Sequence, residues 1–182
     1  MAHPTLTTER LLLRPFTPDD ARSIAGLVDR AYNPARQEEE TVANEGIDII
    51  EDRLAFNRGW ARDGSSVTFA VGIAETGSLI GTSTLMHIDP DHHNAMLSLW
   101  IAPNHRGEGY GTEAATESIR YGFETLSLHQ IYAIRLQENQ LSAKLMKKLG
   151  MRQKGVLEEY FCHNDTYYDC ILHGIMEQDI LP

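Results

Sequence analysis

The sequence predicts an α+β protein with a mixed central β-sheet, folded as a single domain over residues 1–182. Three apolar segments between residues 67 and 101 are joined by short turns, which is typical of antiparallel strands. A helical segment at 110–126 then leads to a strand at 129–136, and a strand reached through a helix runs parallel to the strand before it. With a C-terminal hairpin at 156–176, these patterns predict about seven strands and about four helices around one core.

The N-terminal part is predicted to form a strand and then a helix. Leu11–Leu13 is continuously apolar, as a buried strand is. Thr17 and Pro18 are residue types preferred at the N-cap and at the first position of a helix. One apolar face follows at helical spacing, made of Ala21, Ile24, Ala25, Val28 and Ala31.

Residues 33–46 are polar and acidic, and they include the adjacent Glu38–Glu40. Such a cluster is typical of a solvated loop or helix edge, and the sharper interpretation is a rim that attracts an amine substrate. A second helical segment is expected from Ile47 to about Trp60.

The next three strands are expected at 67–73, 79–88 and 95–101. Apolar residues alternate strictly in the first of them, as in a half-buried strand. Turn-forming residues at 75–78 and 89–91 separate these strands, so they should pair antiparallel.

A glycine-rich loop follows the strand that ends at Ile101. It contains Arg106 and three glycines, Gly107, Gly109 and Gly111, and it leads into an amphipathic helix. Glycines let several backbone N–H groups of a loop point inward, and the start of a helix adds unpaired donors and a partial positive charge. We therefore expect an anionic cofactor, held by its phosphate or pyrophosphate.

Three phosphate-loop patterns can be compared with this loop. A Walker loop ends in Gly-Lys-Ser/Thr, whereas this chain has Gly111-Thr112-Glu113. A dinucleotide fingerprint needs GxGxxG directly after a strand and an acid near the end of the next strand, but Ser127–Ile131 contains none. The third pattern, Arg-x-x-Gly-x-Gly, matches Arg106, Gly109 and Gly111. It resembles the acyl-CoA pyrophosphate loop of the GNAT superfamily of N-acyltransferases.

Beyond the loop, the sequence predicts a helix, a strand, a second helix and the hairpin. Asn139 can cap the second helix, and Gly150 can end it. In that helix the residues expected to face inward are Leu141, Leu145, Met146 and Leu149, and those expected to face outward are Lys144, Lys147 and Lys148.

The two cysteines, Cys162 and Cys170, both lie in the predicted hairpin. With a turn at Asn164-Asp165, Cys162 is expected opposite Tyr167 and Cys170 opposite Glu159. The two thiols are therefore expected to be unpaired and reduced.

The formal net charge of −10 disfavours binding to a nucleic-acid backbone. No apolar run is long enough to cross a bilayer, and MAHPTLTTER has no features of a secretory signal. No cluster of residues has metal-ligand spacing. We expect a cytoplasmic protein without a metal, a nucleic-acid partner or a membrane partner.

Four further segments carry a specific resemblance: TERLLLRPFTPDDA, FETLSLHQIYA, ENQLSAKLMKKLGM and VLEEYFCHNDTYYD. With the order of elements, they resemble the RimJ/RimL-type branch of the GNAT superfamily, which includes ribosomal-protein N-terminal acetyltransferases and is similar to spermidine N-acetyltransferases. The resemblance implies the GNAT fold and acetyl-CoA as co-substrate. It also implies an amine acceptor, either a small molecule or a peptide. Because relatives are often dimers, a homodimer is one oligomeric state to expect.

In the GNAT fold, the strands ending at Ile101 and Leu136 splay apart and admit the pantetheine arm between them. The resemblance implies that the loop holds the pyrophosphate and that Asn139 bonds the pantetheine. The cofactor-binding residues expected on this basis are Leu99, Trp100, Ile101, Arg106, Gly107, Glu108, Gly109, Tyr110, Gly111, Thr112, Asn139 and Ser142.

Two positions depart from better-known members. Met96 stands where many carry a glutamate base, and Met146 stands where many carry a tyrosine acid. The resemblance implies Ser142 as the substitute acid, as in relatives with an NxxS pattern. It also implies that Glu158, Glu159 and Tyr160 lie on the hairpin that borders the substrate cleft, and among them Glu159 is the candidate base. We expect an N-acetyltransferase that works by direct attack in a ternary complex. The alternatives are a GNAT-like module that binds acyl-CoA without catalysis and, more distantly, a nucleotide-binding oxidoreductase.

Overall fold

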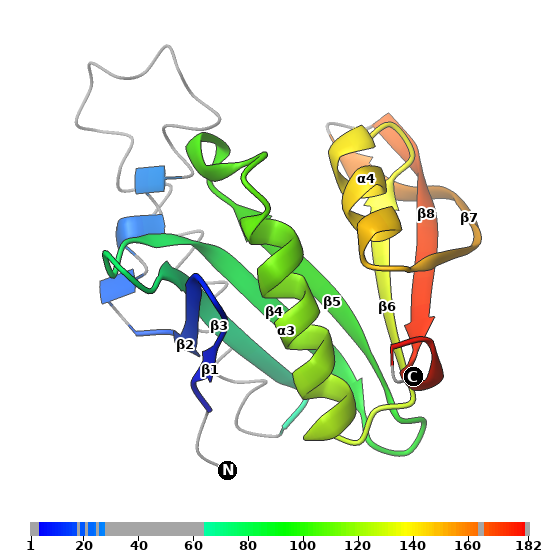
Figure 1. Ribbon diagram of the computed structural model, residues 1–182. Coiled ribbons are helices and arrows are strands. Elements are labelled where there is room, and N and C mark those ends of the chain that lie inside the picture. The colour runs from blue at the N-terminus through cyan, green and yellow to red at the C-terminus, as the bar shows by residue number, and fades with distance from the viewer. Residues whose placement is uncertain are drawn as a thin grey trace.

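A computed structural model of the chain describes residues 4–27, apart from 18, 21 and 25, together with residues 64–163 and 166–180. These residues form one eight-stranded sheet in the order β1-β2-β3-β4-β5-β6-β8-β7 (Figure 1). The strands are β1 (Leu6–Thr7), β2 (Leu11–Pro15), β3 (Ser66–Ile73), β4 (Leu79–Asp89), β5 (Asn94–Ile101), β6 (Gln130–Leu136), β7 (Arg152–His163) and β8 (Thr166–Met176). The two-residue β1 is an addition to the strands expected, because so short a segment has no periodic pattern.

Helices α3 (Tyr110–Glu124) and α4 (Gln140–Lys148) lie over the sheet, and there are two short 3₁₀ turns, η2 (Pro103–His105) and η3 (Glu177–Asp179). Figure 1 shows α3 in front of β4 and β5, and α4 in front of β6. Ile119 of α3, Leu85 of β4 and Ile131 of β6 are completely or almost completely buried in one hydrophobic cluster. The amphipathic pattern of α3 is thus used as the sequence predicts, with the apolar face against the sheet.

The strand β6 pairs very differently on its two sides. It runs parallel to β5 over only three residue pairs, from Asn94 opposite Gln130 to Met96 opposite Tyr132. On the other side it pairs antiparallel with β8 along its whole length, from Gln130 to Leu136. Beyond Met96, β5 and β6 diverge, as Figure 1 shows, and the predicted splayed parallel pair is confirmed.

The register of the C-terminal hairpin corrects one prediction. Cys162 lies opposite Tyr167 as expected, but Cys170 lies opposite Leu157 and not opposite Glu159. The cause is a bulge in β7 between Leu157 and Phe161, which adds residues to one strand only. Both thiols are free all the same, with Cys162 exposed and Cys170 buried.

Near the N-terminus, the described residues between 19 and 27 are helical, and Ile24 is buried. At the expected helix start the Thr17 N–H donates to the Asp20 carboxylate at 2.7 Å, which is one of the two bonds of a capping box. The remainder of that helix, the acidic residues Glu38–Glu40 and the second helix expected to end near Trp60 lie outside the described residues.

Candidate active site

A groove runs along β5 on the side where β6 has turned away. Its larger part, which we call the outer pocket, has a volume of about 990 Å³ and is lined by the end of β5, the glycine loop and α4. Its smaller part, the inner pocket, has a volume of about 240 Å³ and lies deeper along β5, from Leu99 back to Met96. Leu99, Ser142 and Leu145 line both pockets, so the two form one continuous groove.

The glycine loop supplies backbone donors to the outer pocket. Gly107 and Gly109 have φ values of 85° and 91°, in the left-handed region where a side chain would be strained. Gly109 is the N-cap of α3, and the first bond of that helix runs from the Glu113 N–H to the Gly109 carbonyl at 3.0 Å. The N–H groups of residues 110–112 precede that bond, so they have no acceptor within the helix and lie at the positive end of its dipole.

Arg106 stands at the junction of β5 and the loop. Its Nε donates to the carbonyl of Ile101 at 2.7 Å, which fixes the guanidinium against the wall of the outer pocket. Ile101 is one of the expected cofactor-binding residues, but its carbonyl is engaged by this bond. Leu99 and Trp100, which also line the pocket, lie beyond the last residue of β5 that pairs with β6.

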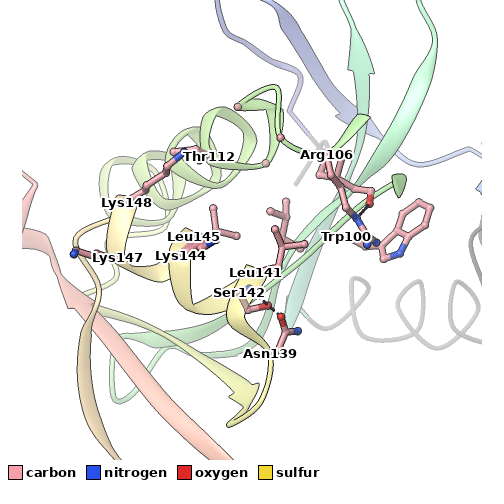
Figure 2. A pocket seen from close by; sticks show the side chains of 15 residues that line it. Trp100, Arg106, Thr112, Asn139, Leu141, Ser142, Lys144, Leu145, Lys147 and Lys148 are labelled. Atoms are coloured by element: carbon pink, nitrogen blue, oxygen red, sulfur yellow. Dashed lines mark hydrogen bonds between the residues drawn. The ribbon is translucent and has the colours of Figure 1, made fainter. Parts of the chain in front are cut away.

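Helix α4 forms the opposite wall. Asn139 caps it as predicted, because its Oδ1 accepts the Ser142 N–H at 3.0 Å; Figure 2 shows this bond at the start of the helix. Gly150, with a φ of 72°, follows its C-terminal end. Leu141 was expected to face the core, but it is 56% exposed, because its face of the helix borders the groove.

Three lysines on α4 line the outer pocket, and sequence reasoning missed this role. They are exposed, as predicted, but the surface they occupy faces the groove (Figure 2). The spacing of Leu141, Lys144, Leu145 and Lys148 is that of one helix face, which was the available signal. With Arg106, the lysines Lys144, Lys147 and Lys148 give the outer pocket a cationic lining, which suits a polyanion.

Ten of the twelve expected cofactor-binding residues line the outer pocket. The other two, Glu108 and Tyr110, belong to the same loop but contact Arg10, on the connection between β1 and β2. The Glu108 carbonyl accepts a hydrogen bond from Arg10, and the Tyr110 ring lies under the Arg10 guanidinium.

The inner pocket contains the two methionines that replace common catalytic residues, Met96 and Met146. Its polar side chains among the described residues are three hydroxyls, those of Ser98, Ser142 and Tyr160. Burial, with a smaller contribution from Tyr160, raises the pKa of Tyr132, so that phenol stays protonated at neutral pH.

Tyr160, which was expected with Glu159 at the border of the substrate cleft, does line the inner pocket, and its position results from the β7 bulge. Within this bulge Glu159 has a φ of 49°, and its N–H donates to the Asp169 side chain at 2.9 Å. The Glu159 side chain is exposed and lines neither pocket. Bulges re-aim the side chains around them, and no local pattern in the sequence announces one.

Among the residues described, no group of His, Cys, Asp and Glu is arranged to hold a metal ion. In the same part of the chain, every helix is too short or too polar to cross a membrane.

Comparison with known proteins gives consistent results. The family model for the acetyltransferase (GNAT) domain matches residues 10–152. The uncharacterized N-acetyltransferase YoaA of Bacillus subtilis is 28% identical over 182 residues, covering 96% of this chain and 97% of that protein. The spermidine N(1)-acetyltransferase of Vibrio cholerae is 33% identical over 125 residues, covering 69% of this chain and 70% of that protein.

A solved structure, Mycobacterium smegmatis RimJ in complex with CoA-disulfide, matches with a TM-score of 0.80 and 21% identity, covering 93% of this chain and 83% of that one. At that identity the match establishes the fold. With the family model covering more than half of the sequence, the chain belongs to the GNAT acetyltransferase family, in its RimJ/RimL-like branch, and is an N-acetyltransferase.

Proposed function

We propose that this enzyme transfers the acetyl group of acetyl-CoA to a primary amine, by direct attack within a ternary complex. The observation that carries the proposal is the continuous groove. It joins an outer end rich in backbone donors and cations to a small inner pocket lined by hydroxyls and methionines.

In this proposal the outer pocket holds the nucleotide part of acetyl-CoA. The loop Arg106–Thr112 bonds the pyrophosphate through its backbone N–H groups, with the charge of Arg106 and of the α4 lysines adding attraction. The unpaired edge of β5 at Leu99 and Trp100 and the Asn139 side chain bond the pantetheine arm. Asn139 can both cap α4 and bond the pantetheine, because capping uses its Oδ1 and leaves its amide NH₂ as a donor.

The reaction needs little machinery beyond positioning. The amine nitrogen attacks the thioester carbonyl carbon, the carbon–sulfur bond breaks, and the sulfur leaves with the electron pair and takes up a proton. A backbone N–H of β5 can stabilise the oxyanion, and Ser142, which lines both pockets, is our candidate acid. Glu159 is our candidate base. Because its carboxylate lies outside the pockets, the amine proton would reach it through water.

For the acceptor, we favour the N-terminal amine of a protein, then a polyamine, then an amino sugar. The inner pocket has room for one amine and its nearest atoms, and its described lining offers no carboxylate to a polycation. The 33% identity to a spermidine N(1)-acetyltransferase keeps the polyamine as the second candidate.

The test combines binding with turnover. Calorimetry should show that the protein binds acetyl-CoA and does not bind NADH. Thiol release should then be followed with an N-terminal peptide, spermidine and glucosamine as acceptors, with an N-terminally blocked peptide as control. Absence of acetyl-CoA binding by the folded protein would refute the proposal, and release with spermidine alone would reverse the order of acceptors.

A further inference from the structure

Arg10 lies on the connection between β1 and β2, about 100 residues before the glycine loop in the sequence, and it contacts the loop and the start of α3 at three points. Its Nη1 donates to the carbonyl of Glu108 at 3.1 Å. Its guanidinium carbon lies 4.6 Å from the centre of the Tyr110 ring. Its Nε and Nη2 meet the Glu113 carboxylate at 2.8 and 2.7 Å. One side chain thus joins the loop to the first turn of α3.

The bond to Glu108 determines how one peptide unit is turned. In a trans peptide the C=O and the N–H point in opposite directions. Since the Glu108 carbonyl points to Arg10, the N–H of Gly109 in the same unit points away from Arg10. Gly109 lines the outer pocket, and the Arg10 Nη2 lies 3.2 Å from the position that a Cβ on this glycine would occupy. Gly109 therefore lies between Arg10 and the pocket, with its donor directed away from the arginine.

Left-handed glycines tolerate several orientations of their peptide units, so the loop does not fix this one by itself. The Tyr110 ring and the Glu113 carboxylate, in turn, hold Arg10 in place. Glu113 also accepts from the Thr8 hydroxyl at 2.6 Å and from the Arg10 N–H at 2.9 Å. These bonds keep the arginine between the β1–β2 connection and the helix.

The contact between Arg10 and Glu113 also changes the net charge beside the proposed pyrophosphate site. Glu113 would otherwise place an uncompensated negative charge one turn from the proposed pyrophosphate site. Partial burial alone would raise the pKa of this carboxyl, but hydrogen bonds from Thr8 and Arg10 outweigh the burial and lower it, so Glu113 is ionised at neutral pH. The Arg10 guanidinium offsets that charge and leaves the helix N-terminus attractive to an anion.

We propose that Arg10 is a positioning residue for the donor substrate, which turns the Gly109 N–H toward the pyrophosphate and neutralises Glu113 beside it. This inference rests on the proposed binding of acetyl-CoA in the groove. It assigns a role in cofactor binding to a residue that does not line the pocket.

The test compares a ligand that has the pyrophosphate with one that lacks it. Arg10→Met should weaken CoA binding about tenfold, the effect of losing one well-oriented hydrogen bond to a charged group. Binding of pantetheine, measured by competition with CoA, should stay within about twofold of wild type. Arg10→Lys keeps the charge but cannot bond Glu108 and Glu113 together, so it should recover only part of the affinity.

Arg152→Met is the matched control, since Arg152 forms an exposed ion pair with Asp179 of η3 and lines neither pocket. It should leave both affinities unchanged. If wild type binds CoA but Arg10→Met binds it equally well, or loses CoA and pantetheine to the same extent, the role of Arg10 is refuted while the proposed function stands. If wild type does not bind CoA, the proposed function fails first. If Arg10→Met does not fold, Arg10→Lys carries the same comparison.

Discussion

The two ends of the groove are built in different ways. The outer end has two walls, one supplied by the continuous stretch from Ile101 to Thr112, which offers backbone N–H groups and includes the start of α3, and the other supplied by side chains of α4. The inner end consists of side chains from four elements, including Met96 on β5, Ile134 on β6, Met146 on α4 and Tyr160 on the β7 bulge. Binding an anion needs groups that every residue carries, whereas moving a proton needs particular side chains in particular places.

This difference separates affinity from turnover. Changes at the outer end should alter the binding of acetyl-CoA, and changes at the inner end should alter its reaction. The first three substitutions below test that separation, and the fourth tests the charge of Glu113 beside the loop; they run from the largest expected effect to the smallest.

Gly109→Trp should reduce acetyl-CoA affinity about 100-fold or more, because a side chain here starts toward Arg10, 3.2 Å from its Nη2, and would displace that guanidinium and distort the loop that lines the outer pocket. The control is Gly64→Trp. Gly64 precedes the start of β3, has a φ of 82° with open space around it, and lines neither pocket. Both variants should lose about 1–3 kcal/mol of stability from the left-handed backbone. Calorimetry that finds equal affinities in the two folded variants would remove the outer pocket from the cofactor site.

Ser142→Ala should lower kcat about 100-fold and leave the acetyl-CoA affinity within about twofold of wild type, if its hydroxyl protonates the leaving sulfur. The Asn139 cap is retained in this variant, because it uses the Ser142 backbone N–H. Tyr160→Phe, which removes another of the hydroxyls that line the inner pocket, should change kcat less than about fivefold. The opposite ranking in steady-state kinetics would transfer the role of acid to Tyr160.

Lys148→Gln should weaken acetyl-CoA binding about two- to fivefold at low salt, since one exposed cation contributes modestly to holding a polyanion. The loss should shrink at high salt as screening increases. Lys154→Gln, an exposed lysine on β7 that lines neither pocket, should have no effect. Titrations at two salt concentrations check this, and equal losses in both variants would mean that only the net charge matters.

Glu113→Gln should lower the Tm by about 2–4 °C at neutral pH, the shift expected from losing about 1 kcal/mol. Because the folded-state pKa of Glu113 is lowered, its contribution is present above the unfolded value of about 4.3 and is lost as pH falls through the folded value. The difference in Tm between wild type and variant should therefore close between about pH 5 and pH 3. Glu75→Gln, at an exposed turn, is the control. A constant difference across this range would contradict the role of the charge.

The sequence by itself determined the architecture and the place of the glycine loop in it. Alternating apolar residues and short turns predicted the antiparallel strands, the helix crossover predicted the parallel pair, and Asn139 and Gly150 marked the limits of α4. These features depend on neighbours in the chain, so local patterns reveal them.

Only the tertiary structure decided which side chains line the inner pocket and how Arg10 contacts the glycine loop. The bulge that brings Tyr160 to the pocket and leaves Glu159 outside comes from the pairing of β7 with β8, and it also moved Cys170 opposite Leu157. The exposure of Leu141 and the bonds from Arg10 to the loop likewise depend on segments distant in sequence. Their physical cause is contact between elements, where a register shift of one or two residues changes which side chains meet, and no local pattern records that shift.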